Sequence, residues 1–125
     1  MLDDGSPLFT QIAELLAGEI AEGTLAEGEQ VPSTNELAAF HRINPATAAK
    51  GISVLMDDGL VEKRRGIGMF VTSGARGRLL DARRRAFTER HVQPLVTEAI
   101  RLGIDAEALV GLIRETTQAQ GGIKV

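Results

Sequence analysis

The chain has 125 residues, a formal net charge of −3, no cysteine, and 43% hydrophobic against 25% charged residues. This composition predicts a globular domain with a small appendage, and it excludes a disordered chain, a disulfide scaffold and a thiol nucleophile. No apolar run reaches the roughly 18–20 residues that cross a bilayer, and the acidic start does not resemble a signal peptide, so we expect a cytoplasmic protein without membrane contact.

The first predicted element is an amphipathic helix over residues 7–22, because apolar side chains recur there every three or four positions. A turn-rich stretch follows. Ser33 and Glu36 then have the spacing of a capping box, in which each side chain bonds the backbone N–H of the other residue. This predicts a short helix that ends near His41, with Leu37, Ala38 and Phe40 as its apolar face.

Asn44 and Pro45 mark the next helix start, because asparagine caps a helix and proline fits its first position. Gly59 ends this helix. Its expected core residues recur at intervals of three and four, and they are Ala48, Gly51, Ile52 and Leu55. Two short helices with a few residues between them indicate a helix-turn-helix.

Two short strands are predicted after the helices, over residues 60–64 and 69–72. The segment 65–68 holds two glycines, which is typical of a hairpin turn. A helix-turn-helix followed by a hairpin is the winged-helix arrangement, so the predicted fold is mainly α with a small β-hairpin.

The remaining residues predict a helical tail after a small-residue joint at 73–75. Residues 76–102 read as helical, with Pro94 expected to kink or break the run. Asp105 caps a last helix. A hairpin this thin cannot bury both of its apolar faces, so we predict dimerisation through Leu79, Leu80, Phe87, Leu95, Leu109, Leu112 and Ile113.

Charge is distributed unevenly along the chain. Residues 1–60 hold two basic and ten acidic residues, whereas residues 61–85 hold eight basic and two acidic ones. A basic segment in an acidic protein indicates a local anion-binding face, although a solvated helix start explains the charge equally well. Arg83, Arg84 and Arg85 fit the solvated face better than a DNA contact.

The residue types at the second helix and at the hairpin suit DNA. A recognition helix presents its first turn, here residues 44–47, to base edges, and Lys50 reaches a phosphate or guanine. Asn44 alternatively only caps the helix. At the hairpin, Arg64 and Arg65 flank a glycine turn that lets the backbone approach the sugar-phosphate wall, although the glycines alternatively serve the turn alone.

Several motifs together resemble the GntR family of bacterial transcription regulators: PLFTQI at 7–12, a glycine–leucine–proline–serine pattern at 23–33, NELA at 35–38, the Asn44-Pro45 start and RRGIGMFV at 64–71. The short tail is similar to that of the YtrA-type subfamily, which implies two dimerisation helices. The resemblance implies a homodimer, an inverted-repeat operator and usually repression, often of transporter genes.

The chain departs from the family pattern at three positions. Most members carry an arginine where this chain has Asn35, and often a basic residue at the positions of Pro45 and Ala49. Because those arginines contact DNA in the family, we expect weaker or differently specific binding here. The DNA-binding candidates are Ser33, Asn35, Asn44, Pro45, Ala46, Thr47, Lys50, Arg64, Arg65, Gly66 and Gly68.

The sequence thus predicts a winged helix-turn-helix domain over residues 1–75 and a dimerisation hairpin over 76–125. The expected function is sequence-specific transcriptional repression by a homodimer on double-stranded DNA. The alternative is a protein-interaction module that kept the winged shape and lost most DNA binding. We expect no enzyme, because no convergent set of titratable residues is present. No cofactor is evident, His41 and His91 lack metal-ligand spacing, and a small-molecule effector is left open.

Overall fold

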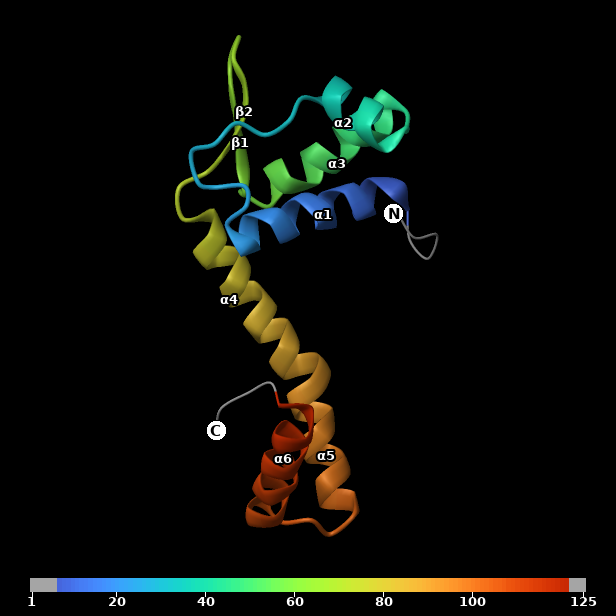
Figure 1. Ribbon diagram of the computed structural model, residues 1–125, viewed down its shortest axis with the longest axis vertical. Coiled ribbons are helices and arrows are strands. Elements are labelled where there is room, and N and C mark those ends of the chain that lie inside the picture. The colour runs from blue at the N-terminus through green and yellow to red at the C-terminus, as the bar shows by residue number, and fades with distance from the viewer. Residues whose placement is uncertain (1–6, 122–125) are drawn as a thin grey trace. The chain divides into compact units, whose positions relative to one another are not determined.

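A computed structural model describes residues 7–121 of the chain, which divides into two compact units, residues 1–82 and 83–125. The elements in chain order, as Figure 1 labels them where there is room, are α1 (Leu8–Glu22), α2 (Thr34–His41), α3 (Pro45–Asp57), β1 (Val61–Arg64), β2 (Gly68–Val71), α4 (Ala75–Phe87), the π-helical turn η1 (Thr88–Val92), α5 (Gln93–Arg101) and α6 (Ala106–Gln120). This order confirms the predicted mainly helical fold with one hairpin.

The core of the first unit forms where α1 packs against α3. The buried stripe of α1 includes Ile12 and Leu16, and that of α3 includes Leu55, all of which are at most 1% exposed. Gly51 lies at the closest approach of the two helices: a Cβ there would sit 2.9 Å from the Phe9 carbonyl oxygen. Close backbone contact therefore requires glycine at position 51, which confirms its predicted place in the core.

Both helix starts predicted from caps are present. Glu36 N–H donates to Ser33 Oγ, and Ser33 N–H donates to the Glu36 carboxylate, which completes the capping box before α2. Asn44 Oδ1 accepts the N–H of Ala46 at the start of α3. The predicted burial of Phe40 is wrong, because its side chain is 82% exposed at the end of a helix of only two turns.

The hairpin is larger than the two predicted strands. β1 and β2 pair antiparallel, with Val61 opposite Val71 and Arg64 opposite Gly68. The segment 28–31, predicted only as turns, adds to the free edge of β2: Val31 N–H donates to the Met69 carbonyl (2.7 Å) and Val71 N–H to the Glu29 carbonyl (3.0 Å). The β1–β2 hairpin, which we call the wing, is thus anchored to the chain before α2 as well as to α3.

The joint at 73–75 is held by hydrogen bonds and is no open linker. Gly74 N–H donates to the Glu27 carboxylate at 2.9 Å, and Ala75 is fully buried as the first residue of α4. Leu79 packs against the core of the first unit. The compact units divide at 82/83, so the first turns of α4 extend the first unit beyond the boundary predicted at 75/76.

The second unit consists of the end of α4, η1, α5 and α6. The expected interruption near Pro94 takes the form of the π-helical turn, after which Pro94 occupies the first turn of α5, where no N–H donor is needed. Asp105 caps α6 as predicted, by accepting the N–H of Ala108. Among the described residues of this unit, Ala99 alone is buried.

None of the helices in the described part of the chain is both long enough and apolar enough to span a membrane.

Candidate nucleic-acid interface

The first turn of α2 presents two of the candidate residues. Ser33 is exposed, but its hydroxyl is engaged in the capping box, which leaves a second lone pair and the hydroxyl proton for an outside partner. Asn35 is exposed, and its side chain makes no hydrogen bond to any residue between 7 and 121. Because Ser33 supplies the cap, Asn35 is not needed to hold the helix and faces solvent.

The first turn of α3 is an exposed polar edge above a buried apolar face. Asn44, Pro45 and Ala46 are exposed and Thr47 is half-buried. The Asn44 side-chain oxygen is used by the cap at 2.8 Å from Ala46 N, whereas its amide nitrogen has no partner in the described chain. The capping role is therefore established, and the amide N–H₂ remains available as a donor.

Lys50 is the one cation on α3, and its position is set by α1. Its Nζ lies 4.2 Å from the centroid of the Phe9 ring, while the side chain as a whole is exposed. A cation–π contact at an exposed site contributes only about 0.5–1 kcal/mol. The contact therefore orients the ammonium without preventing it from reaching an anion.

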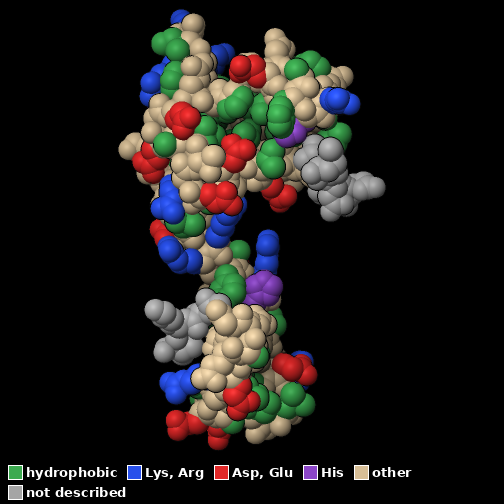
Figure 2. All heavy atoms as spheres, in the orientation of Figure 1, with side chains coloured by type: hydrophobic (Ala, Val, Ile, Leu, Met, Phe, Trp, Pro, Cys, Tyr) green, Lys and Arg blue, Asp and Glu red, His purple; other side chains and the backbone are tan. Residues whose placement is uncertain are grey.

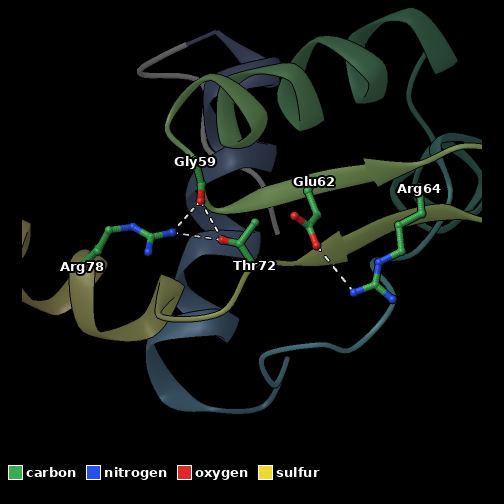
Figure 3. A network of polar contacts seen from close by, with 5 residues as sticks. All are labelled: Gly59, Glu62, Arg64, Thr72 and Arg78. Atoms are coloured by element: carbon green, nitrogen blue, oxygen red, sulfur yellow. Dashed lines mark hydrogen bonds and ion pairs between the residues drawn. The ribbon is translucent and has the colours of Figure 1, made fainter.

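The tip of the hairpin projects from the helices and carries exposed cations (Figures 1 and 2). Gly66 has a φ of 78°, a left-handed conformation that glycine adopts without strain. Arg64 lies along the hairpin, 3.5 Å from the Glu62 carboxylate, as Figure 3 shows, and 4.1 Å from the centroid of the Phe70 ring. Arg65 makes no hydrogen bond or ion pair to the residues that the structure describes.

The two arginines therefore differ in availability. The Arg64–Glu62 pair is about half exposed on both sides, with side-chain values of 47% and 52%. Exposed pairs of this kind contribute between zero and about 1 kcal/mol, so a phosphate can replace the carboxylate. Arg65 needs no such exchange and is the first candidate for a phosphate contact.

Gln30 supports the hairpin tip, and the sequence analysis missed it. Its amide Nε2 donates to the Ile67 carbonyl at 3.0 Å. A Cβ on Gly68 would lie only 2.5 Å from the same nitrogen. Gly68 is half-buried with a φ of 145°, so its role is to admit Gln30 as well as to form the turn. No local signal marks Gln30, because its partner is 37 residues away.

Two further exposed residues near the candidates were also missed. Arg42 follows α2 with a φ of 56°, which is unusual for a residue with a side chain, and it adds a cation to the turn before α3. Ile67, at 63% exposure, places an apolar side chain at the hairpin tip. Apolar side chains at such tips suit the sugar wall of a minor groove.

The histidines lie against aromatic rings. His41 contacts Phe40 at 4.9 Å between ring centroids, and His91 contacts Phe87 at 5.6 Å. Across residues 7–121, no three histidine, aspartate or glutamate side chains gather as a metal site would need. Arg83 and Arg85 are exposed.

The predicted dimerisation residues fall into two groups. Leu79 and Leu80 are half-buried in the first unit, where Leu79 packs on the core. The second unit leaves apolar side chains open to solvent: Phe87 is 59% exposed, and the other members of the predicted set are Leu95 (43%), Leu112 (46%), Ile113 (41%) and half-buried Leu109.

Comparison with known proteins gives a consistent set of relatives. The family model of the bacterial regulatory proteins, gntR family, matches residues 8–71. The HTH-type transcriptional repressor YtrA of Bacillus subtilis is 28% identical over 120 residues, which cover 95% of this chain and 92% of YtrA.

Solved structures agree with the sequence relatives. A GntR-family transcriptional regulator from Bacteroides thetaiotaomicron superposes with a TM-score of 0.74 at 27% identity, covering 90% of this chain and 98% of that one. The DNA-binding domain of AraR, solved in complex with its operator ORX1, matches 58% of this chain and 92% of its own length, at 26% identity and a TM-score of 0.53.

Proposed function

Because the chain belongs to the gntR family of bacterial regulatory proteins and carries a DNA-binding winged helix, we propose that it represses transcription as a homodimer on an inverted-repeat operator. The observation that carries this proposal is the exposure of polar and cationic side chains at the first turn of α3, at Lys50 and at the Arg64–Arg65 hairpin tip. The proposed function involves no catalysis and needs no metal or cofactor. Its DNA target would place it in the bacterial cytoplasm.

The candidate contacts divide into positioning and reading contacts. Arg65 and Arg64 sit on a glycine turn, where cations contact phosphates and add affinity for any sequence. Asn44 and Thr47 sit at the start of the recognition helix, where donors and acceptors reach base edges. Sequence preference is therefore expected to come mainly from α3, and salt-dependent affinity mainly from the wing.

The proposed homodimer rests on the second unit. Its helices leave large apolar side chains open to solvent, including Phe87, Leu112 and Ile113. Contiguous exposed apolar surface is uncommon on a monomeric protein and typical of an interface. A second copy of the chain offers an identical face, which a twofold axis would bring into contact. The two winged domains of such a dimer would then bind the two half-sites of one operator.

Selection from a random duplex pool tests the proposal. The full chain should enrich an inverted repeat whose half-sites lie about one helical turn, roughly 34 Å, apart. Sedimentation equilibrium should give a dimer before and after binding. Failure to enrich any sequence, together with no gel shift at low salt on DNA from its own promoter region, would favour the protein-interaction alternative instead.

A further inference from the structure

The start of α4 is bonded to parts of the winged domain that lie far away in sequence. Two arginines of its first turn, Arg76 and Arg78, donate to backbone carbonyls of other elements. Glu27, in the turn after α1, accepts from the backbone at the same place. We call Glu27, Arg76 and Arg78 the α4 clamp.

Arg78 joins the start of α4 to the ends of α3 and β2 (Figure 3). Its Nη2 donates to the Gly59 carbonyl after α3 at 2.7 Å and to Thr72 Oγ1 after β2 at 3.0 Å, and its Nη1 donates to the Ser73 carbonyl at 3.2 Å. The Thr72 hydroxyl itself donates to Gly59 O at 2.6 Å. A planar guanidinium can serve several acceptors at once, whereas an ammonium is a single point of charge.

The other side of the helix start is tied to α1 and the turn that follows it. Arg76 Nε donates to the Ala21 carbonyl at 2.8 Å, in a partly buried bond. The Glu27 carboxylate accepts the N–H of Gly74 at 2.9 Å and that of Arg76 at 3.4 Å. Gly74 has a φ of 79°, a left-handed conformation that glycine adopts without strain, so the joint favours glycine at this position.

These contacts use the arginines within the protein. The three acceptors of Arg78 lie at the ends of α3 and β2, and that of Arg76 lies at the end of α1. Because both guanidinium groups already bind acceptors inside the protein, we do not include them among the candidate DNA contacts. The contacts also fix the first turn of α4 from two sides. These bonds restrain rotation of the first turn of α4 about the 73–75 joint, which a glycine joint alone would allow.

We propose that the α4 clamp sets the half-site spacing that the protein accepts on DNA, with Arg78 as its main positioning residue. The inference rests on the proposed dimeric function, because half-site spacing matters only when two winged domains are linked in one dimer. With the clamp intact, the winged domains cannot turn to reach half-sites at another spacing, so the affinity of the dimer for such an operator falls. Without it, each winged domain would turn about the 73–75 joint and tolerate other spacings.

The test measures the affinity of the full chain for operators whose half-sites are separated by the selected spacing or by one, two or three base pairs more or less. The variants are Arg78→Ala, Arg78→Lys and Glu27→Ala. Arg85→Ala is the control, since it removes the same charge from an exposed position of the same helix. Binding to a duplex with a single half-site reports whether the winged domain is still folded and reads DNA.

The wild-type chain should lose about a hundredfold in affinity two base pairs from its best spacing, because avidity requires simultaneous contact. In Arg78→Ala and Glu27→Ala, the loss should shrink to about tenfold or less, while half-site affinity stays within about twofold. Arg78→Lys should fall between, and Arg85→Ala should match the wild type.

Three results would overturn the inference. Unchanged spacing profiles in Arg78→Ala and Glu27→Ala would show that the clamp does not set spacing. Lost half-site binding in both variants would assign these contacts to folding of the domain. If the wild-type chain binds a half-site but shows no spacing preference, the proposed dimeric function is overturned as well. This third result is seen with the wild-type chain alone, whereas the first two require the variants.

Discussion

The two compact units of this protein differ in where their apolar side chains lie. In the first unit, Ile12, Leu16 and Leu55 are at most 1% exposed, and helices, hairpin and the start of α4 all contribute to one core. In the described part of the second unit, Ala99 alone is buried, and most of the large apolar side chains are 41–71% exposed, namely Phe87, Leu95, Val96, Ile100, Leu102, Val110, Leu112 and Ile113.

This difference teaches that the two units obtain stability in different ways. The winged unit has its own cluster of buried apolar residues, so we expect it to fold as a single chain. In the second unit, Asp105 caps α6, but a cap gives only about 1 kcal/mol and supplies no core. We therefore expect the second unit to depend on a partner that the first does not need.

Removal of the second unit tests this contrast most directly. A fragment of residues 1–82, which keeps Ala75 and Leu79 in the core, should fold as a monomer and bind a two-half-site operator about 10²–10⁴-fold more weakly than the full chain. Circular dichroism and sedimentation equilibrium measure folding and mass, and a titration measures affinity. A stable dimer of this fragment would place the dimer interface in the winged unit instead.

A single methyl group inside the winged core gives the next largest effect. Gly51→Ala should destabilise the protein by about 1–3 kcal/mol, because the new Cβ meets the Phe9 backbone and Ile12 at 2.9 Å. Gly18→Ala is the matched control in α1, where nothing lies within 4 Å, and it should raise stability by about 0.5–1 kcal/mol. Equal melting temperatures for the two variants would show that the α1–α3 contact is looser than the structure has it.

Removal of an exposed cation from the wing should weaken DNA binding without changing the free energy of unfolding, unlike the core substitution Gly51→Ala. Arg65→Ala removes an exposed cation that has no partner in residues 7–121. It should weaken binding to all sequences and reduce the slope of log affinity against log salt by about one unit. Salt titrations on the selected operator and on a scrambled duplex measure both effects. A changed base preference with an unchanged salt slope would mean that Arg65 reads a base edge.

The smallest expected effect is at Asn35, an exposed residue that the capping box leaves uncommitted. Asn35→Arg should strengthen binding several-fold at low salt by adding a phosphate contact, and Asn35→Ala should be silent. If Asn35 instead pairs with adenine, Asn35→Ala would cost roughly 1–3 kcal/mol at one operator position. Measuring both variants on one operator separates these roles, and no change in either would remove residue 35 from the interface.

Local signals in the sequence predicted the helix starts and the wing turn correctly. The capping box of Ser33 and Glu36, the Asn44-Pro45 start and the glycine turn at 65–68 each act over a few residues. A cap or a turn is satisfied by its own neighbours, so its chemistry can be recognised without knowledge of the fold. The same is true of the face of α3 that carries Ala48 and Leu55.

Contacts between distant parts of the chain were decided only by the tertiary structure. The pairing of segment 28–31 with β2, the bond from Gln30 to Ile67 and the bond from Arg78 to Gly59 join residues 19 to about 40 positions apart. Nothing in the local pattern distinguishes an arginine that faces solvent, such as Arg85, from Arg78, which holds three acceptors. The sequence by itself therefore determined the elements and the family resemblance, whereas the folded core determined which polar side chains support the wing and which fix α4, because those bonds exist only once burial has brought their partners together.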